Sequence, residues 1–207
     1  TNMAVAASSM SQELEFNAAT MGLLFSAFSW AYGLMQIPGG WFIEYVGSRI
    51  SYTVSLFFWS LFTIFMGLGN SFASLFGIRL AIGATEAPAF PTNSRVVASW
   101  FPAKERATAT SIYTAGEFIG LAFLTPVLFW ILENYGWREI FYVTGVIGIL
   151  ASIVWYFLYR EPSENSGANQ AELDYIREGG GLVETKSEKQ SITWSQVTYL
   201  FKHRQLL

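Results

Sequence analysis

The chain has 207 residues, of which 52% are hydrophobic, 17% aromatic and only 13% charged. With a positive mean hydropathy, these proportions are typical of a membrane protein rather than of a soluble domain. The net charge of -3 is not accompanied by a basic stripe, so nucleic acid is excluded as an expected partner. Cysteine is absent, which excludes a disulfide framework and a thiolate metal site.

Five long apolar runs follow one another along the chain, and each is long enough for a helix that spans a lipid bilayer. They cover residues 18–43, 50–68, 72–100, 107–132 and 140–159. Residues 1–10 are small and mildly apolar, and no initiator Met precedes Thr1. We therefore expect them to be the end of a truncated first helix, followed by a polar loop at 11–17. The charged segment 160–207 is expected to be a loop with a short amphipathic helix at 171–178.

Positively charged residues are concentrated in alternate connections between these runs. One side has Arg49, Lys104, Arg106 and Arg160, whereas the other has no Lys or Arg at 11–17 or around 69–71, and only Arg138 near the fifth run. Positive loops remain in the cytoplasm. The sequence therefore predicts a multi-pass protein of the inner (plasma) membrane, with residues 11–17 outside and the segment after the fifth run inside.

The third run carries two ionisable residues, Arg79 and Glu86. Two helical turns, about 10 Å, separate them along one face, and Asn93 continues that face if Pro88 and Pro91 only kink the helix. A charge at the bilayer centre costs about 2.5–3.5 kcal/mol on insertion scales, so both side chains should face protein or a water-filled cavity. A buried ion pair that fixes helix packing is one interpretation. The two-turn separation favours the other, a solvated functional site.

Other polar residues in the apolar runs leave two interpretations open. Ser29, Tyr32 and Gln36 share one helical face, where they could bond neighbouring helices or line a polar cavity. Glu117 is a third ionisable residue within the runs. It could be a protonated carboxyl inside the bundle or part of the same site.

The connection between the first two runs has a recognisable pattern. Gly40, Glu44, Gly47 and Arg49 predict a tight polar turn, in which Glu44 can meet a helix N-terminus and Arg49 can pair across the loop. Placed between two uncharged spans, this pattern resembles the loop signature of the major facilitator superfamily. That signature usually has Asp at the position of Glu44 and a basic residue at the position of Tyr45.

Further segments resemble the anion:cation symporters of that superfamily. They are QIPGGWF (36–42), EAPAFPTN (86–93), WFPAKER (100–106) and GLAFLTP (120–126). The string AELDYIREGGGLV (171–183) is similar to the branch that carries galactonate-like sugar acids. The resemblance implies an all-α membrane protein, the N-terminal six-helix half of a transporter that lacks most of helix 1. The partner of this half would be the missing C-terminal half of the same chain.

The resemblance also implies a function, secondary active uptake of a hexonate anion with protons. Glu86 would bind the driving proton, and Arg79 would stabilise its deprotonated form. Tyr32 would contact the sugar acid, and Glu117 stands where relatives carry a glutamine that hydrogen-bonds substrate. Ser29 and Gln36 complete the expected binding face.

Several alternatives remain open from the sequence. The same family includes symporters of glucarate, galactarate and hexuronates, and a descendant could sense a sugar acid without moving it. A membrane-embedded enzyme using Glu86 and Glu117 as an acid/base pair is disfavoured, because the apolar runs have no His, Asp or Cys. No cofactor or metal is expected, since His203 and Asp174 both lie in the tail.

Overall fold

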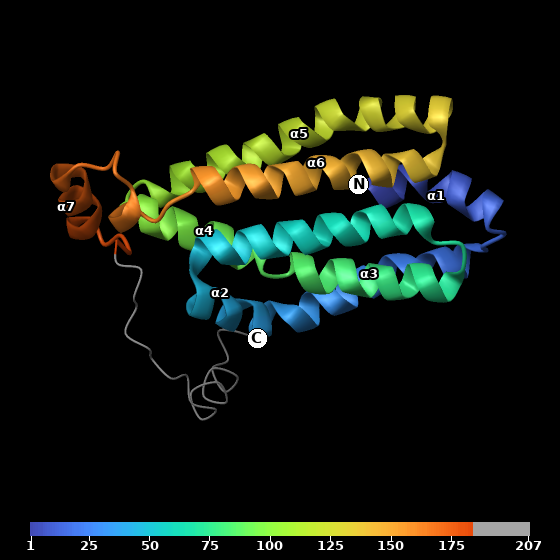
Figure 1. Ribbon diagram of the computed structural model, residues 1–207, viewed down its shortest axis with the longest axis horizontal. Helices are drawn as coiled ribbons and strands as arrows, with labels where there is room; N and C mark the ends of the chain where they lie inside the picture. The colour runs from blue at the N-terminus through green and yellow to red at the C-terminus, as the bar shows by residue number, and fades with distance from the viewer. Residues whose placement is uncertain (184–207) are drawn as a thin grey trace.

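The computed structural model describes residues 1–183, and within that range every regular element is a helix. The long helices lie side by side along the long axis of the molecule, and the short α7 (Gln170–Glu178) lies at one end (Figure 1). The all-α fold predicted from the apolar runs is therefore confirmed. Residues 184–207, which include His203, lie outside the described part.

The first helix, α1 (Asn2–Glu13), extends into the segment 11–17 that the sequence predicted to be a loop. The Leu14 N–H donates to the Met10 carbonyl at 2.9 Å, and the Met10 side chain is fully buried. Nothing between these residues breaks a helix, so burial of Met10 favours the extra turn. The chain leaves the helix at Glu15, which has a φ of 54°.

The second helix, α2 (Ala18–Leu68), is two antiparallel arms joined at a sharp bend. The bend is at Gly47, whose φ of 78° is strained for any residue with a Cβ. The arms, residues 18–46 and 48–68, contain the first two apolar runs. In Figure 1 the second arm runs back in the direction opposite to the first.

The third apolar run forms two helices, α3 (Phe72–Glu86) and α4 (Ala89–Trp100). They are separated at Ala87 and Pro88, both of which keep right-handed helical backbone angles. The Ala87 N–H still donates to the Gly83 carbonyl at 3.1 Å, whereas Pro88 has no N–H to continue the series. The two helices therefore follow one another with a local break, and Asn93 is on the far side of it.

The remaining long helices are α5 (Arg106–Tyr135) and α6 (Trp137–Leu158), joined at Gly136 with a φ of 95°. A 3₁₀ turn, η1 (Pro162–Glu164), leads to α7. Of the described helices, α2, α5 and α6 are long and apolar enough to cross a membrane. Five separate spans remain a prediction, because α2 contains two of them and the third is divided between α3 and α4.

The core of the bundle lies towards the end that contains α1. Because Gly83 has no Cβ, α3 can approach the first arm of α2 closely. A Cβ added there would lie 2.4 Å from the Phe28 carbonyl oxygen of α2. This contact fixes α3 against the first arm. The largest fully buried apolar side chains come from α1, both arms of α2, α3, α5 and α6; they are Met10, Leu24, Met66, Leu75, Leu128 and Ile140.

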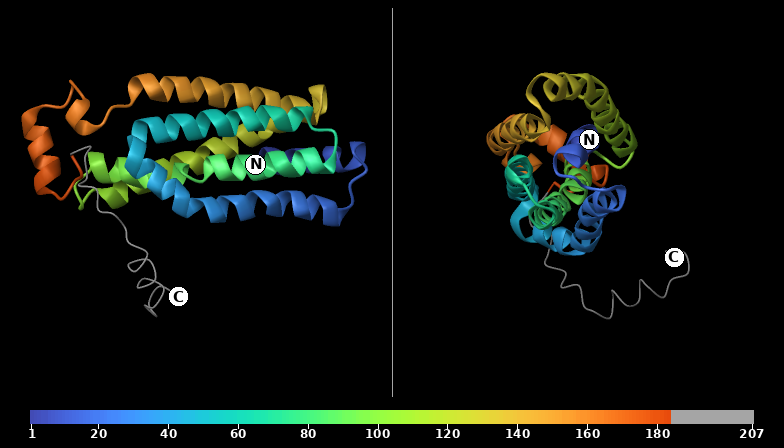
Figure 2. Two further views of the ribbon diagram at one scale, coloured as in Figure 1. Left: turned by 60° about the horizontal axis from the view of Figure 1, so that its bottom comes forward. Right: turned by 90° about the vertical axis from the view of Figure 1, so that its right-hand side faces the viewer.

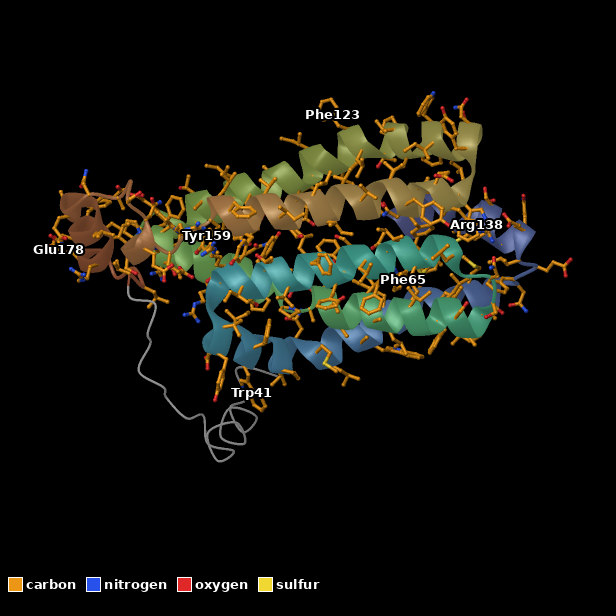
Figure 3. The ribbon with its side chains drawn as sticks, in the orientation of Figure 1. Trp41, Phe65, Phe123, Arg138, Tyr159 and Glu178 are labelled. Carbon is orange, nitrogen blue, oxygen red and sulfur yellow. The ribbon has the colours of Figure 1, made fainter. Side chains whose placement is uncertain are left out.

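Many apolar side chains point away from the bundle. Phe123 of α5 and Trp41 of α2 are examples, with exposed fractions of 76% and 46%, and they lie on opposite outer sides (Figure 3). Figure 2 likewise places α5 and the bend of α2 on opposite sides in the view along the bundle. Lipid is as apolar as these side chains, so such faces suit helices in a bilayer.

A cluster of polar side chains connects α1 to α6 at the α1 end of the bundle. Glu13 forms an ion pair with Arg138 and accepts a hydrogen bond from Trp137 Nε1 at 2.7 Å. Arg138 also donates to Asn70 Oδ1 at 2.8 Å, and Figure 3 shows it beside α1. The Arg138 hydrogen bond, followed by that from Trp137, lowers the pKa of Glu13 below its usual range.

Candidate functional site

Two cavities open between the helices, with volumes of about 940 and 880 Å³. Both are within the size range of small-molecule sites. The α7-side cavity reaches Phe101 and Glu105 at the α4–α5 turn, and the α1-side cavity reaches the first residues of α1. Three side chains line both cavities: Trp59, Glu86 and Glu117. They form the shared wall, which comes from α2, α3 and α5.

The α7-side cavity has a mainly apolar wall with several polar groups in it, and no positive charge among the described residues. In the part of the chain that the structure describes, no Lys or Arg lines it. Its polar lining includes the hydroxyls of Tyr32, Tyr52, Thr108 and Tyr113, the amide of Asn93, and the carboxyls of Glu86, Glu105 and Glu117. Hydroxyl and amide groups both donate and accept hydrogen bonds, so this wall suits a ligand rich in hydroxyls.

The α1-side cavity contains a guanidinium group held at one edge. Arg79 Nε donates to the Leu24 carbonyl at 3.2 Å, and the guanidinium carbon is 4.8 Å from the centroid of the Phe28 ring. Within residues 1–183 Arg79 forms no ion pair. Arginine has five N–H donors, and only the Nε donor is occupied here. The two terminal nitrogens are thus available to an anion in the cavity.

Arg79 and Glu86 both line the α1-side cavity, which fits their two-turn spacing on α3. Glu86 is the last residue of α3, directly before the break at Ala87 and Pro88. Its carboxyl is half-buried and, among the described residues, has no ion-pair partner. The structure therefore brings together one cation and one carboxyl that do not neutralise each other by contact.

The three polar residues of the first arm of α2 do not meet at one place. Ser29 lines only the α1-side cavity, Tyr32 lines only the α7-side cavity, and Gln36 lines neither. Seven residues cover about 10 Å along a helix axis, so Ser29 and Gln36 lie at different heights along the first arm of α2. A shared helical face therefore does not give a shared site.

The loop signature residues lie away from both cavities. Gly47 provides the bend, and Arg49 Nε donates to the Tyr156 carbonyl at 2.8 Å while its guanidinium carbon is 4.2 Å from the centroid of that ring. Glu44 is exposed and forms no ion pair within residues 1–183, and a Cβ on Gly40 would meet nothing within 4 Å. Arg49 thus connects the bend to α6 rather than to Glu44.

A buried carboxylate near the bend gave no signal in the sequence. Glu161 is 5% exposed and accepts hydrogen bonds from the Ser48 N–H at 3.3 Å and the Tyr159 hydroxyl at 3.0 Å. Figure 3 shows Tyr159 where α6 ends near α4. Because Ser48 begins the second arm of α2, Glu161 satisfies a free N–H at a helix start.

The family is decided by comparison with known sequences. Residues 1–207 match the family model of the Major Facilitator Superfamily. The chain belongs to this superfamily. It is 49% identical, over 100% of its length and 49% of the relative, to a D-galactonate transporter of Escherichia coli. It is 42% identical, over 90% of its length and 44% of the relative, to an Escherichia coli protein named "probable galactarate/D-glucarate transporter".

A solved structure from the superfamily has the same fold. It is a bacterial homologue of the human lysosomal transporter Spinster in an inward-facing, occupied conformation, with a TM-score of 0.64 and 26% identity. The match covers 78% of this chain and 41% of the solved one. The chain spans about half the length of the curated relatives it matches. These relatives are transporters, which agrees with the expectation that the protein is not an enzyme.

Several residues that line the α7-side cavity of this chain were not predicted from the sequence. Trp59, Tyr52, Tyr113 and Trp155 line the α7-side cavity. Aromatic residues in an apolar run look the same whether they face lipid, core or cavity, so only the packing of the helices separates them. Asn93 did have a signal, its spacing of seven from Glu86.

Within residues 1–183 no group of three His, Asp or Glu side chains could hold a metal ion.

Proposed function

We propose that the protein containing this chain takes up a sugar acid anion together with protons across the inner membrane. Relatives named for galactonate and for galactarate or glucarate support a sugar acid as the substrate. The observation that carries the proposal is Arg79, a half-buried guanidinium without an ion-pair partner among the described residues, in a cavity that also contains Glu86. Charge-assisted, bidentate hydrogen bonds make arginine well suited to a carboxylate.

Coupling follows from the relation between these two side chains. Glu86 carries the proton, and Arg79 stabilises its deprotonated form through space. When an anion binds to Arg79, it weakens that stabilisation, and Glu86 takes up a proton. Because such linkage is reciprocal, a protonated Glu86 also favours binding of the anion. The anion and the proton therefore bind together.

The substrate contacts in this half come from both cavities. Ser29 lies on the Arg79 side, Tyr32 on the other side, and Glu117 in the shared wall. Gln36 lines neither cavity, so we leave it out of the proposed contact set. The complementary half of the transporter would supply the remaining contacts near the bilayer midplane, and rocking of the halves would give alternating access.

The test uses the full-length protein in proteoliposomes with labelled galactonate and an inwardly directed proton gradient. We expect accumulation above equilibrium that a protonophore abolishes. Galactonate binding without transport would instead indicate a sensor. Transport of galactarate, glucarate or a hexuronate but not of galactonate would assign the protein to another branch of the family.

A further inference from the structure

A groove of about 300 Å³ opens on the outside of the bundle between the second arm of α2 and α6. These two helices lie side by side (Figures 1 and 2). Near the middle of α6 they pack closely, because a Cβ added to Gly148 would collide with the side chain of Ser60. From Ser152 to the end of α6 no glycine permits such an approach, and the groove lies along this stretch.

The wall of the groove is apolar. The hydroxyls of Thr53 and Ser152, which both line it, donate to carbonyl groups of their own helices at 2.7 Å. The other lining side chains, except that of Tyr156, are aliphatic or phenyl groups, and they are Val54, Phe57, Phe58, Ile153 and Phe157. Lipid tails are as apolar as these groups, so the groove suits an acyl chain of the bilayer.

Two arginines meet at the α7 end of the groove. Arg49 Nε donates to the Tyr156 carbonyl at 2.8 Å, and Arg160 Nη1 donates to the same oxygen at 3.0 Å. The Arg49 guanidinium carbon is also 4.2 Å from the centroid of the Tyr156 ring, and Tyr156 lines the groove. Tyr156 therefore joins the pair of arginines to the apolar wall.

The positive charge of this pair is not neutralised by contact with a carboxylate. Within residues 1–183 neither arginine forms an ion pair. The adjacent carboxylate, Glu161, is 5% exposed and accepts hydrogen bonds from the Ser48 N–H and the Tyr159 hydroxyl. In the same range both terminal nitrogens of Arg49, and Nη2 of Arg160, have no hydrogen-bond partner. Two neighbouring guanidinium groups repel each other, so an anion between them would be stabilising.

A phosphate group attached to an acyl chain fits both parts of this surface. Arginine binds phosphate oxygens through charge-assisted, often bidentate hydrogen bonds. Basic pockets between membrane helices on the cytoplasmic side bind anionic headgroups, and the sequence predicts that Arg49 and Arg160 lie on that side. The nine residues from Arg49 to Phe58 cover about 13 Å along the helix axis, so a headgroup and the first part of one chain would lie in line.

We propose that this groove binds an anionic phospholipid, with its phosphate held by Arg49 and Arg160 and one acyl chain lying between the second arm of α2 and α6. The site is separate from both cavities, and its occupancy does not depend on which substrate the protein carries. Because the lipid would contact both helices, its binding would also stabilise their packing.

The experiment measures lipid binding to the full-length protein in detergent by native mass spectrometry. The probes are phosphatidylglycerol, which is anionic, and phosphatidylcholine with the same acyl chains, which is zwitterionic. We expect the wild type to bind phosphatidylglycerol at least about tenfold more tightly. Arg49→Gln and Arg160→Gln should each weaken that binding by about fivefold and leave phosphatidylcholine binding unchanged. Lys104→Gln is the matched control, because Lys104 is an exposed cation at the same end that does not line the groove.

A second pair of variants tests the groove itself and keeps the test decisive if an arginine variant does not fold. Ile153→Trp fills the groove and should weaken binding of both lipids, whereas Leu150→Trp, at an exposed position of α6 outside the groove, should not. Equal affinity of the wild type for the two lipids overturns the proposal. So does phosphatidylglycerol binding that Ile153→Trp leaves unchanged, or that Lys104→Gln weakens as much as the arginine variants do. Displacement of the lipid by an equal concentration of glycerol phosphate would instead indicate a site for a free phosphate, which also contradicts it.

Discussion

Glu86 and Arg79 share a helix face, yet they form no ion pair with each other. Arg79 donates to a main-chain carbonyl and stacks on a ring, and Glu86 adjoins both cavities. The cost of charge in a bilayer was sufficient to select these residues from the sequence. What surrounds them depends on helices far away in the chain, which no local pattern encodes.

The ion pair of Glu13 with Arg138 predicts a pH-dependent contribution to stability. The pKa of Glu13 is lowered in the folded protein by the Arg138 hydrogen bond and then by that of Trp137. A lowered pKa means that the contribution is present above the ordinary value of about 4.3 and is lost as pH falls through the folded value. Glu13→Gln should therefore lower the melting temperature of the full-length protein slightly at pH 7, and the difference should vanish in acid.

Glu15→Gln is the control, because Glu15 is exposed in the same turn and forms no ion pair within the described residues. Its melting temperature should match the wild type throughout. A difference for Glu13→Gln that is as large at pH 3 as at pH 7 would show that the carboxylate charge is irrelevant.

At the scale of the helix, contact between α3 and the first arm of α2 predicts an asymmetry between two glycines. A Cβ on Gly83 would lie 2.4 Å from the main-chain oxygen of Phe28, whereas a Cβ on Gly77 would meet nothing within 4 Å. Gly83→Ala should destabilise the full-length protein by about 1–3 kcal/mol, because the backbone cannot give way as a side chain can. Gly77→Ala should be neutral or slightly stabilising, since Ala favours helix. Thermal unfolding compares them, and equal melting temperatures would contradict this packing.

Sequence patterns predicted the helices better than their ends. Uncharged runs indicated helices directly, and Gly47 and Gly136 end them where positive φ values allow a turn. The extension of α1 depends on burial of Met10, a tertiary effect that periodicity does not contain. The candidate site shows the same division, because Arg79, Glu86 and Glu117 stand out in the sequence as ionisable residues within apolar runs, whereas Trp59 and Trp155 do not.

At the scale of the whole molecule, charge at the two ends predicts the orientation in the membrane. The turns at the α7 end carry Arg49, Lys104, Arg106 and Arg160, and Arg138 at the other end is paired with Glu13. Positive loops stay in the cytoplasm. In an otherwise cysteine-free full-length protein, Leu14→Cys should react with an impermeant thiol reagent added outside, and Glu178→Cys should not. The reverse labelling would invert the topology.

The central claim is that Glu86 couples a proton to sugar acid movement, and Glu86→Gln in the full-length protein tests it most directly. Glutamine resembles the protonated acid in size but cannot release a proton. We expect galactonate binding and exchange across the proteoliposome membrane to persist, because exchange needs no net proton release, and proton-driven accumulation to be lost. Accumulation that survives Glu86→Gln but is abolished by Glu117→Gln would contradict the claim and place the coupling proton on α5.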